Sequence, residues 1–128
     1  MKPPTFVRPL TDHERQALKA ALRSPDAFTL RRCQILLASA DGQRAPQIAR
    51  TLGCELRDDG SITVDASQET TVERIYAAGN CTDPRALVPA SAGSGVTAAV
   101  AINARLSLDD ADQAVADLGA RSPAARVR

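Results

Sequence analysis

The feature that most constrains this chain is a change of pattern at residues 52–54. Before this point the apolar side chains recur at helical spacing, whereas after it come a turn-forming run at residues 58–60 and alternating apolar residues. Charge changes at the same place, since residues 1–54 carry nine Lys and Arg against four Asp and Glu, and residues 55–128 carry seven against eleven. The sequence therefore predicts two parts of different origin that pack loosely on each other.

Three helices are predicted in the first part. Thr11 with Glu14 three positions later forms a capping box, and Asp26 is a suitable cap for a second helix. Pro46 suits the first turn of a short third helix, which Gly53 ends. The first part is thus expected to be a small three-helix bundle.

Four blocks of this first part follow one another as in bacterial insertion-sequence transposases: residues 6–11, 26–38, 46–50 and 52–54. Residues 1–54 resemble the N-terminal helix-turn-helix of that family, in which the next segment is a recognition helix for the major groove. Here the next segment is acidic and turn-forming, so we expect a truncated helix-turn-helix. The resemblance implies weak, non-specific contacts between DNA phosphates and four arginines, which are Arg31, Arg32, Arg44 and Arg50.

The second part combines short strands with helices. The pattern predicts a β-hairpin from residues 55–57 and 61–65, one strand at 75–78, a helix at 96–106, a second helix at 107–118, and a disordered tail at 119–128. Together with the three helices before it, this makes an α+β fold.

The second part also carries a family resemblance. The matching blocks are residues 60–65, 75–80, 83–86, 92–95 and 98–103. Residues 52–118 resemble the C-terminal end of the FAD-binding, Rossmann-like domain in thioredoxin-reductase-like NAD(P)/FAD-dependent oxidoreductases. As a domain, this fragment is expected to span residues 55–118. The triplet at residues 52–54 suits both resemblances, so we place the junction of a chimera there.

The flavoprotein resemblance implies an FAD site at four residues. Gly79 lets the backbone approach the flavin, and Asn80 hydrogen-bonds the ribityl chain where the family usually has an aspartate. Leu87 stands where the family has a glutamine, and Val88 offers its backbone amide. The small residues 93–95 are expected to precede the helix whose N-terminus points at the flavin.

Other family features do not occur in the sequence. It contains no GxGxxG and no CxxC, and its cysteines, Cys33, Cys54 and Cys81, are far apart. Because there is also only one histidine, we predict no metal site and no catalytic residues. No apolar run has membrane-spanning length, and we expect a cytoplasmic protein.

Composition predicts a small core. Alanine accounts for 24 residues and aromatic side chains for only three, so each buried side chain removes little area from water. We therefore expect exposed apolar surface and self-association through four residues, Ile75, Tyr76, Val96 and Val100.

Three functional hypotheses follow. The first is a fragment of a flavin-dependent oxidoreductase, fused to a truncated transposase helix-turn-helix and without independent catalysis. The second is a DNA-binding module of transposase origin, and the third is an inert remnant of recombination.

Overall fold

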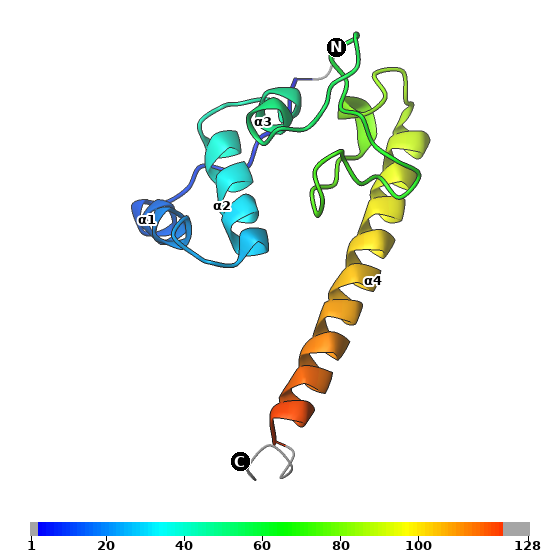
Figure 1. The fold of residues 1–128 in the computed structure, drawn as a ribbon. Helices are drawn as coiled ribbons and strands as arrows, with labels where there is room; N and C mark the ends of the chain where they lie inside the picture. Colours follow the sequence, from blue (N-terminus) through cyan, green and yellow to red (C-terminus); the bar gives the residue numbers. More distant parts are fainter. Residues whose placement is uncertain (1–2, 122–128) are drawn as a thin grey trace.

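The computed structural model describes residues 3–121 and is mostly helical (Figure 1). Its elements in chain order are α1 (Asp12–Ala21), α2 (Ala27–Ala40), α3 (Ala45–Thr51), the single 3-10 turn η1 (Gly79–Cys81) and α4 (Val88–Arg121). Between α3 and η1 the chain forms a long irregular segment that lies beside the first half of α4 (Figure 1).

The caps predicted for the first two helices are present. The Thr11 hydroxyl accepts from the Glu14 amide at 3.2 Å, and the Glu14 carboxylate accepts from the Thr11 amide at 2.9 Å. The Asp26 carboxylate accepts from the amides of Phe28 and Thr29, at 3.3 and 2.8 Å. These side chains satisfy amides that a helix cannot pair internally, which confirms the predicted helix starts.

The α+β prediction is wrong, because residues 3–121 contain no strand and no sheet. The predicted hairpin is reduced to one isolated bridge between Leu56 and Ile62, and the predicted strand at 75–78 to one between Glu69 and Tyr76. In this segment, side-chain carboxylates accept hydrogen bonds from backbone amides that a β-ladder could otherwise use. Asp59 accepts from the Ser61 amide at 2.9 Å, and one oxygen of Asp65 accepts from two amides further along. Such local turns offer the backbone amides an alternative to a ladder.

The prediction of two C-terminal helices is also wrong, since α4 runs unbroken for 34 residues. Ser107, expected as a cap, instead donates its hydroxyl to the Asn103 carbonyl at 2.9 Å within the helix. Alanine, the strongest helix former, is frequent along α4 and favours continuation through this point. Of the predicted tail, residues 119–121 belong to α4, whereas residues 122–128 lie outside the described residues.

One small core joins the two parts of the chain. Its buried residues are Ala49, Cys54, Ile62 and Ile75, surrounded by half-buried apolar side chains from both sides of residue 54. The two parts of the chain therefore share a core, although a small one. An apolar cavity of about 240 Å³ borders it, so the packing is incomplete.

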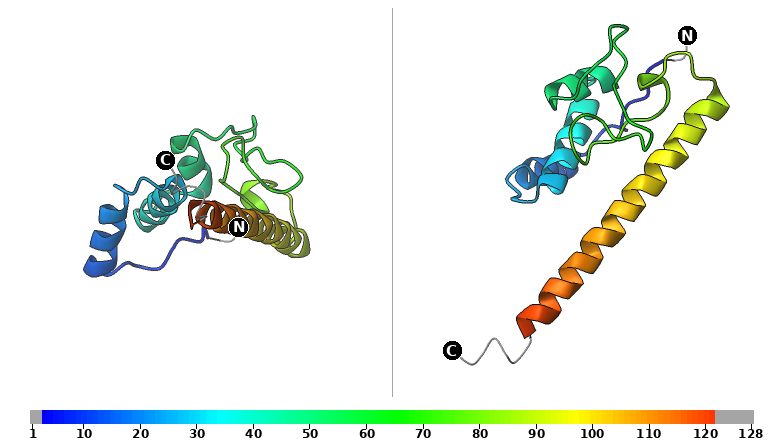
Figure 2. Two further views of the ribbon diagram at one scale, coloured as in Figure 1. Left: turned by 60° about the horizontal axis from the view of Figure 1, so that its bottom comes forward. Right: turned by 45° about the vertical axis from the view of Figure 1, so that its right-hand side comes forward.

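The long helix is covered only as far as Asp109, which binds Arg74. Ala98 is buried, whereas residues 110–121 are all exposed. Figures 1 and 2 show this end of α4 extending beyond the rest of the molecule. Val96 and Val100 are exposed as predicted, but Ile75 is buried and Tyr76 half-buried, so the exposure predicted for Ile75 is wrong.

Candidate functional site

The turn η1 packs against the first turns of α4. The Gly79 amide donates to the Ser94 hydroxyl at 2.9 Å, and that hydroxyl donates to the Ser91 carbonyl at 2.8 Å. Gly79 has a φ of +81°, and a Cβ there would lie 3.7 Å from the Ser91 side chain. The backbone conformation, more than the available space, therefore requires glycine at this position.

Asn80 faces the same helix. Its side-chain oxygen accepts from the Ser91 hydroxyl at 2.7 Å. The Gly79 carbonyl accepts from the Thr82 hydroxyl at 2.9 Å and from the amides of Thr82 and Asp83, at 2.9 and 3.1 Å. These bonds hold the loop after Asn80 in one conformation beside α4.

Leu87 and Val88 lie at the start of α4 and point to solvent, with 76% and 72% of their surface exposed. Val88 is the first residue of the helix, so its amide is among those that have no partner within the helix. The helix N-terminus was predicted after Gly95, and this is wrong because Gly93 and Gly95 lie inside α4.

A polar cleft of about 330 Å³ opens beside Gly79 and Ser94. Arg57 lines it and donates from Nη1 to the Thr82 carbonyl at 3.0 Å. Asp65 lines it as well, and hydrogen bonds, first that of the Ser67 hydroxyl, lower the pKa of its carboxyl. Of the four predicted flavin contacts, only Gly79 lines this cleft; Asn80, Leu87 and Val88 do not.

The arginines predicted to contact DNA are spread over two helices. Arg31 donates from Nη1 to the Glu73 carbonyl at 2.8 Å, and the Arg32 guanidinium lies 5.5 Å from the centre of the Phe28 ring. Arg44 precedes α3 and Arg50 lies in its last turn, and both are exposed. The two arginines of α2 thus make contacts within the chain.

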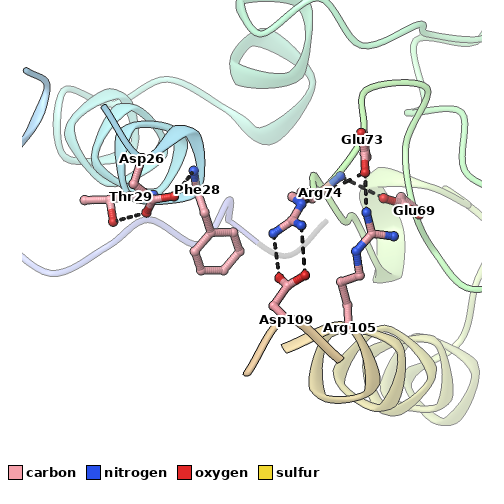
Figure 3. A network of polar contacts seen from close by, with 8 residues as sticks. All are labelled: Asp26, Phe28, Thr29, Glu69, Glu73, Arg74, Arg105 and Asp109. Carbon is pink, nitrogen blue, oxygen red and sulfur yellow. Dashed lines mark hydrogen bonds and ion pairs between the residues drawn. The ribbon is translucent and has the colours of Figure 1, made fainter. Parts of the chain in front are cut away.

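A network of charged residues was missed by the sequence analysis (Figure 3). Arg74 donates from both terminal nitrogens to Asp109, at 2.7 and 3.0 Å, and Arg105 pairs with Glu73. Arg74 has a φ of +66°, and its amide donates to the Glu69 carboxylate at 2.7 Å. This network ties the irregular segment to the middle of α4. The two ion pairs to α4 join residues more than 30 positions apart, so no local spacing pattern indicates them.

The cysteines do not form a redox pair in this structure. Cys33, Cys54 and Cys81 are free thiols, and burial raises the pKa of Cys81. Within residues 3–121, no three His, Cys, Asp or Glu side chains gather in a way that would hold a metal ion. Nor does any helix in that range have the length and apolar character to cross a membrane.

Comparison with known proteins places the chain in a class. The signature of the pyridine nucleotide-disulphide oxidoreductase family matches residues 12–104, on both sides of the 52–54 triplet. The chain therefore belongs to this family.

A curated relative, the mercuric reductase of Shigella flexneri, is 36% identical over 72 residues. The aligned stretch is 56% of this chain but only 13% of that protein, so the chain spans a small part of its relative. No solved structure matches the chain.

Members of this family are generally FAD-dependent, so the turn at η1 and the start of α4 can be compared with what a flavin needs. At the start of this 34-residue helix Val88 carries an amide and Pro89 has none, and the nearby Asn80 side-chain oxygen accepts from the Ser91 hydroxyl. A flavin edge needs donors of this kind. A Gly-rich pyrophosphate turn is not found in the sequence, so these residues could serve only the ring and ribityl portion of FAD.

Proposed function

We propose that this chain is a fragment of a FAD- and NAD(P)-dependent oxidoreductase of the thioredoxin-reductase-like kind, without independent catalysis. The observation that carries the proposal is the packing of the Gly79–Asn80 turn on the first turns of α4, through Ser91 and Ser94. This is the pair of segments that the flavoprotein resemblance assigns to the flavin. The family match across residues 12–104 supports the same conclusion.

In this proposal the flavin lies over the start of α4. The Val88 amide donates to the electron-rich edge of the ring, the Asn80 side chain meets the ribityl hydroxyls, and the exposed Leu87 side chain covers apolar ring atoms. When bound, the flavin would supply the capacity to take up and release electrons. The chain's own residues bind and orient it.

The proposal assigns no redox partner to the chain. The sequence has no CxxC to exchange electrons with a flavin, and of its thiols Cys33 and Cys54 are buried. Because the sequence has no CxxC to exchange electrons with a flavin, no substrate site is proposed either. The fragment is expected to bind flavin without turning over substrate.

Titration of the purified chain with FAD, followed by quenching of flavin fluorescence, tests this directly. We expect saturable binding that Asn80→Ala weakens by about three- to tenfold, the usual effect of removing one hydrogen bond. Asn103→Ala is the matched control, because Asn103 is an exposed asparagine on α4, away from the turn. Equal loss in both variants, or no binding by a folded chain, would contradict the proposal.

The fusion is a further part of this proposal. We divide the chain into a truncated transposase-like helix-turn-helix at 1–54, the flavoprotein fragment at 55–118 and a tail at 119–128. The change of charge and pattern at residue 54 supports this division, whereas the family match at residues 12–104 extends across it. Sequencing the gene and its transcript tests it, and two intact neighbouring genes without a continuous message would contradict it.

The other two hypotheses remain predictions that the same preparation can test. DNA binding, if present, would be weak, strongly salt-dependent and indifferent to sequence, because Arg31 and Arg32 already make contacts within the chain. An inert remnant would bind neither flavin nor DNA.

A further inference from the structure

One face of α4 is largely apolar, although Thr97 and Ser107 also lie on it. Seven residues at intervals of three and four positions define what we call the outer face: Val96, Val100, Ala104, Leu108, Ala111, Val115 and Leu118. At about 100° per residue they fall within an arc of about 120°. The charged side chains of α4 all lie outside that arc.

The outer face has no partner within the described residues. Its Val and Leu side chains are 63% to 70% exposed. The irregular segment instead holds the opposite side of α4, where Ala98 is buried and Asp109 binds Arg74. A helix normally buries its apolar stripe, and helices in proteins owe most of their stability to such packing.

Charge indicates what would cover this face. The second half of α4 carries four aspartates, at 109, 110, 112 and 117, whereas residues 88–108 contain Arg105 and no acidic residue. Asp109 faces the irregular segment, but two α4 helices side by side in parallel would bring the other three aspartates of both copies together along their flanks. In antiparallel order the acidic half of each copy lies beside the half of the other that has no acidic residue, and the helix dipoles are opposed.

Side-chain size favours the same arrangement. In an antiparallel pair centred near Asp109, Val100 lies opposite Leu118 of the second copy, and Ala104 opposite its Ala114. Ala104, Ala111 and Ala114 let the helices approach closely on either side of Leu108, while Val100 and Leu118 pack at the ends. On the flank, Arg105 comes near Asp112 of the second copy, a pair of opposite charge.

We propose that the outer face of α4 pairs two copies of this chain in antiparallel order. From Val100 to Leu118 the paired stretch is about 27 Å long at ~1.5 Å per residue, and a strip about 10 Å wide covers about 270 Å² per copy. Stable complexes bury about 800 Å² per partner, so the dimer is weak and depends on concentration. The inference goes beyond flavin binding and does not depend on it.

Sedimentation velocity of the full chain from about 10 μM to about 1 mM tests the pairing. We expect the mass to rise from monomer towards dimer. Ala111→Asp places a charge at the centre of the outer face and should raise the dissociation constant at least about tenfold. Ala116→Asp is the matched control, because Ala116 is equally exposed and lies on the opposite side of the helix.

Both substitutions are at exposed positions, and circular dichroism at 222 nm checks that α4 persists in each. A wild-type chain that stays monomeric throughout the range would overturn the proposal. So would an equal effect of Ala111→Asp and Ala116→Asp.

Orientation is tested by cysteine cross-linking of mixed variants. In the antiparallel pair, Ala104→Cys should form a disulfide with Ala114→Cys, while either variant alone should not exceed the wild-type background. Homodisulfides of Ala104→Cys alone would overturn the antiparallel arrangement. If the FAD titration showed no binding, the sedimentation and cross-linking results would still test the pairing of α4.

Discussion

Residues 12–51 and residues 55–87 are held in shape by different means. In the first region, backbone hydrogen bonds within three helices fix the chain, and side chains such as Thr11 and Asp26 act at helix ends. In the second, residues such as Asp59, Asp65 and Thr70 bond to nearby amides and replace a regular ladder. Yet both regions contribute to the same small core. A segment without strands can thus be ordered when side chains satisfy its backbone and an adjacent helix covers its apolar residues.

The shared core should make the two regions unfold together. Ile75→Ala removes a buried side chain beside the 240 Å³ cavity and should destabilise the chain by about 2–5 kcal/mol. Urea unfolding can be followed by circular dichroism for the helices and by fluorescence of Tyr76, the single tyrosine, for the second region. We expect the two signals to shift to lower urea together.

Val115→Ala serves as the control, because Val115 is exposed on α4, and it should leave both monomer transitions nearly unchanged at low protein concentration. If the Tyr76 signal alone moved in Ile75→Ala, the two regions would be independent and the shared core would be wrong.

Two glycine substitutions test the turn at Gly79 and the helix α4 separately. Gly79→Ala forces a side chain into a left-handed conformation and should cost about 1–2 kcal/mol. Gly93→Ala lies in α4 with nothing near its Cβ position, and should stabilise the chain by about 0.5–1 kcal/mol. Thermal unfolding measures both, and changes of the same sign would show that the turn at Gly79 is described incorrectly.

Acid should weaken the cap of α1 over a defined range. The hydrogen bond from Arg8, with that from the Thr11 amide, lowers the pKa of Glu14 from 4.5 to about 2. Since the folded pKa is depressed, the stabilisation is fully present above pH 4.5 and is lost as the pH falls towards 2. Comparing the melting temperature of Glu14→Gln with that of wild type tests this.

The difference in melting temperature between Glu14→Gln and wild type should be small at pH 6, because the ion pair of Glu14 with Arg8 is exposed. This difference should shrink to nothing near pH 2. A difference that grows as the pH falls would contradict the assigned cap. Lowered carboxyl pKa values also occur in the second region, at Asp59 and Asp65, so acid should loosen both regions.

What the sequence predicts well is local. Thr11 and Glu14 are three positions apart, as are Asp26 and Thr29, so the helix starts follow from neighbouring residues alone. The predicted strand at 75–78 needed partners that the chain does not supply, and only a single bridge at Tyr76 remains. Ser107 shows a further limit, because its hydroxyl suits a cap or a bond within a helix, and the alanines around it favour the second.

For the candidate site, too, the sequence predicted the local features and not the contacts between distant segments. Gly79 and Asn80 were identified from their sequence motif, but their packing on Ser91 and Ser94 depends on where α4 begins. That beginning was predicted eight residues too late, at Val96 in place of Val88. The pairing of Arg74 with Asp109 spans 35 residues and follows from the folded arrangement only.

The most direct test of the account compares FAD with riboflavin as ligands of the same chain. The proposed contacts reach the ring and ribityl portion that both molecules share, so their dissociation constants should agree within about threefold. Competition of riboflavin for bound FAD, followed by fluorescence, measures this. FAD binding that riboflavin cannot displace would contradict the assigned contacts, and the absence of binding by either ligand would contradict the flavin-binding role itself.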